Sequence, residues 1–128
     1  MSMADFYVIS VHHTKRHDRY ITLWRPDDRG YCWRTARAGK YDRERVNASL
    51  GYYNNGENIA VPIEIVDAMA RPGDPRDFDG VTHDMPISAL RAVPNTRDAW
   101  KRLIANAIAP TQYPIRAEYP GARRRKDQ

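Results

Sequence analysis

The sequence predicts an α+β fold, with a three-stranded antiparallel meander at the N-terminus, two or three short helices packed on it, and an extended basic C-terminal tail. Three observations predict this arrangement. Residues 1–41 are rich in β-branched and aromatic side chains, and turn-like runs divide them. Later segments have apolar residues at helical spacing behind capping residues. Residues 110–128 hold three prolines and a basic run, with few apolar side chains.

Three strands are expected in the meander: Phe6–Thr14, Tyr20–Arg25 and residues 31–37. The polar run Lys15–Arg19 separates the first two strands. Pro26, two aspartates, Arg29 and Gly30 form a strong turn signal before the third strand.

A four-residue loop, 27–30, would fix the register between the second and third strands. The pairs expected on one face are Trp24 with Trp33, Thr22 with Thr35, and Tyr20 with Arg37. The opposite face would be the core face, formed by Ile9, Val11, Ile21, Leu23, Cys32 and Ala36.

Two helices are expected in the middle of the chain. Asp42 can cap a short helix, which Gly51 is placed to end. Pro62 suits the first position of a second helix that runs to about Ala70. The run Arg71–Pro86, with three prolines and repeated Asp and Gly, predicts an irregular surface connection.

The clearest helix follows Asn95 or Thr96 and is stopped by Pro110. We therefore expect one α+β domain over residues 1–109. Residues 110–128 have little to bury, so an extended and partly disordered tail is expected there.

The composition is that of a globular chain: 128 residues, 41% hydrophobic, with a net charge of +5. The first 41 residues carry +4, residues 42–109 carry −2, and residues 110–128 carry +3. No apolar run approaches the ~18 residues of a membrane span, no export signal is evident, and Cys32 is the single cysteine. These features predict a cytoplasmic protein with no membrane contact and no disulfide.

The candidate binding surface lies on the meander. It combines aromatic rings, a histidine and arginines, namely His12, Tyr20, Trp24, Tyr31, Trp33, Arg34 and Arg37. Such a surface could stack bases or anchor a protein partner. The alternative is that Trp24 and Trp33 belong to the core, because large aromatics are mostly buried and the helices must cover one sheet face.

Other chemistry has weaker support in the sequence, which predicts no metal, no cofactor and no catalytic residue. His12 and His13 are neighbours on an expected strand and should point to opposite faces, so they are poorly placed to share an ion. Cys32 is expected to be a small, inert core residue. Residues 38–40 (AGK) lack the glycine and hydroxyl of a phosphate-binding loop. The possibility of an enzyme without a recognisable motif stays open, because catalytic groups can converge from distant positions.

Three stretches, 21–33 (ITLWRPDDRGYCW), 38–41 (AGKY) and 50–62 (LGYYNNGENIAVP), together resemble small accessory proteins of bacteriophages and prophages. The resemblance covers most of the chain and assigns no activity to any residue. It implies a non-enzymatic binder of the counter-defence type, such as an anti-CRISPR inhibitor, that docks on a host protein or ribonucleoprotein complex.

The main alternative is a nucleic-acid or nucleotide-binding protein. In that case the aromatic sheet would stack bases, and the tail residues Arg123, Arg124, Arg125 and Lys126 would contact phosphates. The sequence leaves open whether the chain is a monomer or a homodimer.

Overall fold

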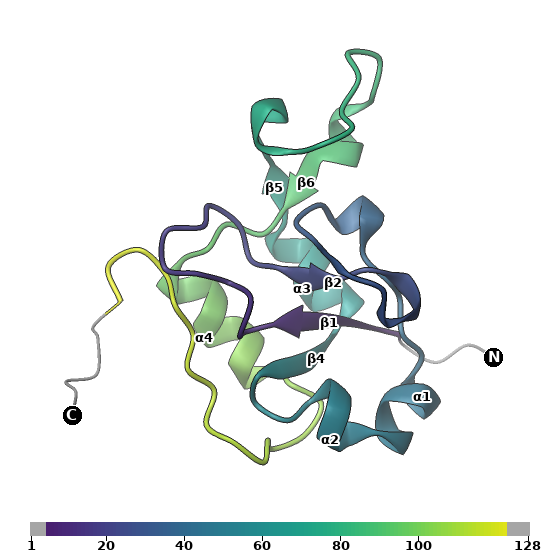
Figure 1. Cartoon of the computed structure of the whole chain (residues 1–128), viewed down its shortest axis with the longest axis vertical. Helices are drawn as coiled ribbons and strands as arrows, with labels where there is room; N and C mark the ends of the chain where they lie inside the picture. The colour runs from purple at the N-terminus through teal and green to yellow at the C-terminus, as the bar shows by residue number, and fades with distance from the viewer. Residues whose placement is uncertain (1–4, 123–128) are drawn as a thin grey trace.

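The structure is a computed structural model that describes residues 5–122, and it confirms the α+β class (Figure 1). The described residues form a four-stranded antiparallel sheet, a second two-stranded sheet and four α-helices. None of these helices has the length and apolarity that crossing a bilayer requires.

The main sheet has the strand order β3-β2-β1-β4. Strands β1 (Phe6–Ser10), β2 (Leu23–Trp24) and β3 (Tyr31–Cys32) lie in chain order, which confirms the predicted meander, although each strand is shorter than expected. Strand β4 (Asn58–Pro62) was not predicted. Its three central residues are apolar and all buried, so the sequence shows no alternation of apolar and polar residues there. In the structure, β4 pairs with the whole of β1.

The predicted register between β2 and β3 is wrong. Trp24 lies opposite Tyr31, not opposite Trp33, and Leu23 lies opposite Cys32. The loop has the predicted four residues but begins one residue earlier, because the Arg25 N–H donates to the Gly30 carbonyl at 2.8 Å.

The expected pairs of Thr22 with Thr35 and of Tyr20 with Arg37 are wrong as well, because β3 ends at Cys32. Thr35–Arg37 form a 3-10 turn, η2, and Arg34 pairs with Ala92 instead.

Both faces of the main sheet are buried, whereas the sequence predicted one core face. On β1, Tyr7 and Ile9 point into a core under the two later helices, while Phe6 and Val8 point into a second core on the other face. The expected core residues Ile9, Val11, Ile21 and Leu23 all belong to the first core. Cys32 is only partly buried beside it, and Ala36 is exposed because the third strand ends early.

Helices α3 (Ile63–Met69) and α4 (Arg97–Ala105) cover the first core. Both were predicted, and the Thr96 side chain caps α4 by accepting from the Ala99 N–H.

Helices α1 (Arg43–Ala48) and α2 (Leu50–Tyr53) cover the second core. Asp42 caps α1 as predicted. Gly51 does not end that helix but lies inside α2, because α1 stops at Ala48 and a new turn starts at Leu50.

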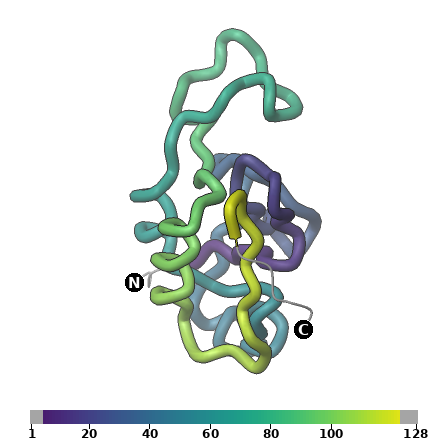
Figure 2. Tube along the Cα trace, turned by 90° about the vertical axis from the view of Figure 1, so that its left-hand side faces the viewer, coloured from purple at the N-terminus to yellow at the C-terminus, as the bar shows by residue number. Residues whose placement is uncertain are grey.

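Residues 71–92, here called the arm, project from the body at the top of Figures 1 and 2. Strand β5 (Arg71–Pro72) pairs with β6 (Arg91–Ala92) at the base of the arm. Two 3-10 turns, η3 (Pro75–Asp77) and η4 (Ile87–Leu90), lie between them. The predicted connection is therefore mostly irregular, but it is closed at its base by a short antiparallel pair.

Residues 110–122 form no helix or strand and run beside α4 (Figure 2). The expectation that this stretch has little to bury is wrong, because Ile115, Ala117 and Tyr119 pack against the first core. The predicted tail contacts at 123–126 lie outside the described residues.

Candidate functional site

A cavity of about 400 Å³ opens between the outer strand of the meander and the arm. We call it the aromatic pocket. Its lining residues are His13, Asp18, Thr22, Tyr31, Cys32, Trp33, Arg34, Arg37, Asp77, Phe78 and Asp79. The meander and the arm are far apart in sequence, so the pocket exists only because the arm folds back beside β3.

Three rings form one wall of this region. The ring centroids of Tyr20 and Trp33 lie 5.3 Å apart, those of Tyr20 and Phe78 lie 5.2 Å apart, and those of Trp33 and Phe78 lie 6.5 Å apart. These separations are those of favourable tilted and edge-to-face packing. Trp33 and Phe78 are half-buried, so their rings stay partly accessible from the cavity.

Gly73 makes this packing possible. A Cβ atom there would lie 2.6 Å from the Phe78 ring and 2.9 Å from the Tyr20 hydroxyl. Both distances are below van der Waals contact, so a larger residue would push the rings apart.

The Tyr20 hydroxyl ties the arm to the meander. It donates to Asp77 Oδ2 at 2.9 Å and accepts from the Asp74 N–H at 3.1 Å. Burial, together with the hydrogen bond to Asp77, raises the pKa of Tyr20 above its ordinary value, so the hydroxyl keeps its proton near neutral pH. Arg19 Nη1 lies 3.6 Å from the same Asp77 carboxylate.

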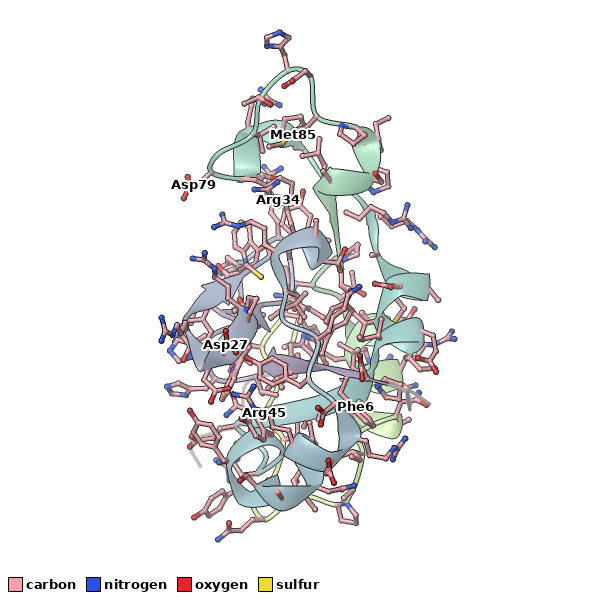
Figure 3. The ribbon with its side chains drawn as sticks, turned by 90° about the vertical axis from the view of Figure 1, so that its right-hand side faces the viewer. Phe6, Asp27, Arg34, Arg45, Asp79 and Met85 are labelled. Atoms are coloured by element: carbon pink, nitrogen blue, oxygen red, sulfur yellow. The ribbon has the colours of Figure 1, made fainter. Side chains whose placement is uncertain are left out.

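Arg34 is buried and is the second tie between the two segments. Its guanidinium donates to the carbonyls of Ala89 at 3.3 Å and Asp79 at 3.0 Å, and it lies 5.8 Å from the Phe78 ring centroid. Figure 3 shows this side chain beneath the arm, with Met85 above it. Both terminal nitrogens of Arg34 already donate to the arm, so Arg34 positions the arm, while Arg37 is exposed at the pocket rim.

Cys32 lines the pocket but is not activated. Burial raises the pKa of its thiol to about 11, against the weaker opposing effect of nearby arginines. Its Sγ lies 3.6 Å from the Arg34 carbonyl. The thiolate, which is the reactive form, is therefore scarce near neutral pH.

Tyr31 and His13 separate the aromatic pocket from a second hollow. Their rings are stacked, with centroids 4.1 Å apart, and Tyr31 is 46% exposed. The second hollow has a volume of about 230 Å³, and its other lining residues are His12, Trp24, Asp28, Gly30, Tyr52, Glu57 and Asn58.

His12 and His13 do not point to opposite faces as expected. They lie in the turn after β1, not on the strand, and their ring centroids are 5.0 Å apart. Within residues 5–122, however, no three His, Cys, Asp or Glu side chains are grouped so as to hold a metal ion.

Trp24 lies in the second core. Only 6% of it is exposed, and its ring packs edge-on against Tyr41, Tyr52 and Tyr53. The structure thus divides the seven predicted binding residues. Tyr31, Trp33, Arg34 and Arg37 line the aromatic pocket with Tyr20 behind them, whereas His12 and Trp24 line the second hollow.

No protein-family model, curated protein or solved structure matches the chain. The lining of the aromatic pocket includes three carboxylates, those of Asp18, Asp77 and Asp79, but only two guanidinium groups, of which one is already engaged by carbonyls. Such a mixed lining suits a protein surface better than a phosphate group, which needs several free cations.

Sequence reasoning missed the residues that the arm contributes, Asp77, Phe78 and Asp79. The composition of the arm predicts a surface connection and says nothing of where it docks. One signal was present: Phe78 is the only phenylalanine, tyrosine or tryptophan in 71–86, and a lone large ring in a proline-rich loop is usually packed against something.

Proposed function

We propose that this chain is a binding protein of the phage accessory type, which inhibits a host defence complex by docking on it through the aromatic pocket. The observation that supports docking is the pocket itself. Half-buried Trp33 and Phe78, exposed Tyr31 and exposed Arg37 surround one cavity. Trp, Tyr and Arg are the residues that contribute most to protein–protein binding energy.

The charges of the pocket support a protein partner over a nucleotide. Asp77 and Asp79 come from the arm, and Asp18 comes from the turn before β2. They oppose the approach of phosphates, while they can pair with the lysines and arginines of a protein surface. The phage context and the host target come from the resemblance of the three sequence stretches described above.

The test is affinity capture from host-cell lysate, with and without nuclease, using the wild type and two matched variants. Arg37→Glu reverses an exposed charge at the pocket rim, and Arg29→Glu reverses an exposed charge on the neighbouring turn, outside the pocket lining. Trp33→Ala removes the central ring of the pocket.

The expected result is a protein partner that survives nuclease treatment, stays bound to Arg29→Glu, and is lost with Arg37→Glu and Trp33→Ala. Far-UV circular dichroism of each variant checks that the fold is kept. Capture that disappears with nuclease, or that is equal for all the variants, would overturn the proposal.

A second candidate, a nucleotide or single-stranded nucleic-acid binder, is favoured by one observation. Tyr31 and Tyr52, which are 46% and 50% exposed, line the second hollow with His12 and His13 and offer ring surfaces for stacking. Asp28 and Glu57 in the same hollow oppose phosphates. In a titration with a labelled oligonucleotide, binding that weakens steeply with salt and is lost in Tyr31→Ala would favour this candidate.

A further inference from the structure

A third cavity, separate from the aromatic pocket and from the second hollow, lies between α4 and the C-terminal segment. We call it the α4 groove. Its volume is about 640 Å³, and its lining residues are Arg97, Trp100, Lys101, Ile104, Ile115, Arg116, Ala117, Glu118, Tyr119 and Ala122. None of these residues lines the aromatic pocket.

The C-terminal segment that forms one side of the groove is anchored at two points. The Tyr113 N–H donates to the Asn55 carbonyl at 2.8 Å, and Arg16 Nη1 donates to the Ala122 carbonyl at 2.6 Å. Gly56 allows the first anchor, because a Cβ atom there would lie 2.2 Å from the Tyr113 carbonyl oxygen. The segment is therefore held in place beside α4 (Figure 2).

Between the anchors, the peptide groups of 115–118 have no hydrogen-bond partner among the described residues. Ile115, Ala117 and Tyr119 pack alternately on the first core, as residues of a strand do. Within residues 5–122, the N–H and carbonyl groups of 115–118 make no hydrogen bond. A fixed, extended segment with unpaired peptide groups is the kind of edge to which another chain adds as a strand.

The charged residues of the groove favour an occupant of negative charge. Arg97, Lys101 and Arg116 are exposed, and none of them makes an ion pair or side-chain hydrogen bond with another described residue. The one acid of the lining, Glu118, lies 3.6 Å from Arg16. The groove thus presents three cations that have no partner among residues 5–122.

We propose that the α4 groove binds an extended acidic segment of a partner protein. The backbone of that segment would pair with residues 115–118, its carboxylates would lie against Arg97, Lys101 and Arg116, and its alternate apolar side chains would meet Ile104 and Ile115. Ile104 is 37% exposed and supplies apolar surface to the groove.

The unpaired backbone favours a peptide over nucleic acid, because only another peptide can satisfy the peptide groups of an extended segment in register. Tyr119 is also the only ring besides the buried Trp100 in the groove lining, which gives little surface for stacking bases. The basic run 123–126 of this chain has a positive charge, as the groove has, so repulsion makes it a poor occupant.

The test uses the full chain and a fluorescent synthetic peptide of about eight residues that alternates Glu with Val, the length of an ordinary strand. The same peptide with Lys in place of Glu is the reference. Fluorescence polarisation should show binding of the acidic peptide, weakening as salt rises, and binding of the basic peptide at least about tenfold weaker.

Charge reversal locates the site. Lys101→Glu and Arg116→Glu should each weaken binding of the acidic peptide roughly 5- to 30-fold, which is the effect expected from replacing an exposed attraction by a repulsion. Arg102→Glu is the matched control on the same helix, because Arg102 is exposed and lies outside the groove lining. It should change the affinity less than about twofold.

Hydrogen–deuterium exchange then tests the strand pairing. Added acidic peptide should slow exchange of the backbone amides in 115–118 of the wild type. Equal binding of both peptides, equal affinity of the wild type and Lys101→Glu, or unchanged exchange in 115–118 would overturn the proposal. So would displacement of the acidic peptide by a single-stranded oligonucleotide at lower concentration than by unlabelled peptide.

Discussion

Trp24 and Trp33 lie on and just after neighbouring strands of one meander, yet they have opposite surroundings. Trp24 is 6% exposed under α1 and α2, enclosed by three tyrosine rings. Trp33 is half-buried, contacts two rings and faces a cavity that the arm completes. One tryptophan therefore belongs to the core and the other to a surface that a partner can reach.

The difference comes from what covers each ring, not from the strands themselves. Helices α1 and α2 bury Trp24 with the apolar and aromatic side chains Val46 and Tyr53. The arm approaches Trp33 with Phe78 and two carboxylates, which leave a cavity instead of filling it. A buried tryptophan and a tryptophan that lines a cavity thus occur in the same small meander.

Alanine substitution should separate the two tryptophans most clearly. We expect Trp24→Ala to lower the free energy of unfolding by about 3–5 kcal/mol, the cost of removing a fully packed large ring. Trp33→Ala should cost roughly 1–2 kcal/mol, since the ring is only partly buried and already meets solvent at the cavity. Urea denaturation followed by circular dichroism measures both values.

The comparison fails if the two substitutions have equal costs. Trp24→Phe serves as the control for the core position, because it keeps an aromatic ring and should restore part of the lost stability. The single hydrogen bond of the Trp33 ring, from Nε1 to the Thr22 hydroxyl at 3.3 Å, is too weak to change this order.

Substitution of Arg34 tests whether the arm is responsible for the different surroundings of Trp24 and Trp33. In Arg34→Gln, the carbonyls of Ala89 and Asp79 lose a buried donor, which we expect to cost about 2 kcal/mol. Amide exchange in the arm should accelerate more than exchange in β1 and β4, because the arm loses one of the contacts that hold it against the meander.

Arg37→Gln is the matched control, because Arg37 is exposed at the pocket rim and its side chain makes no hydrogen bond or ion pair with the arm within the described residues. It should leave both stability and exchange of the arm unchanged. Uniform acceleration across the sheet in Arg34→Gln would mean that Arg34 supports the whole fold and not the arm in particular.

The elements that a local sequence pattern predicts are present in the structure. The meander, the Asp42 cap, the helix after Pro62 and the helix after Thr96 are all present. Strand β4 was missed because Ile59, Ala60 and Val61 are all buried, so their pattern has no alternation. Its pairing with β1 is a long-range contact that no local pattern contains.

The register error arose from Asp27 and Asp28, which adopt φ values of 60° and 59°. Turn propensity marks this run as a turn but does not say which residue begins it. The Arg45 guanidinium lies 3.2 Å from Asp28 and 3.8 Å from Asp27, so contacts from α1 accompany the observed turn (Figure 3).

Only the meander residues of the candidate site could be predicted from the sequence, again because local patterns do not contain long-range contacts. The meander residues of the pocket stand close together in the sequence, and their aromatic and arginine content marks them out. The arm residues are brought there by contacts of Tyr20 and Arg34 that include pairs 57 and 55 residues apart in sequence, and by the close approach that Gly73 allows. Only the three-dimensional structure joins the two halves.

His13 gives the smallest expected effect, at the wall between the two hollows. Burial, with a lesser contribution from His12 and Lys15, lowers the pKa of His13 below its ordinary value of 6.5. A lowered pKa means that the unfolded chain binds the proton more readily. The contribution to stability is therefore complete above pH 6.5 and is lost as pH falls through the folded pKa.

An NMR titration of the His13 ring protons measures this shift, and the size of the stability change should be small because the side chain is largely exposed. In Tyr31→Ala the stacked ring is gone, so the His13 pKa should rise toward 6.5. His12→Asn removes a neighbouring charge and should raise it less, because burial is the larger cause. If His12→Asn had the greater effect, the charge of His12 and not the Tyr31 stack would set the protonation of His13.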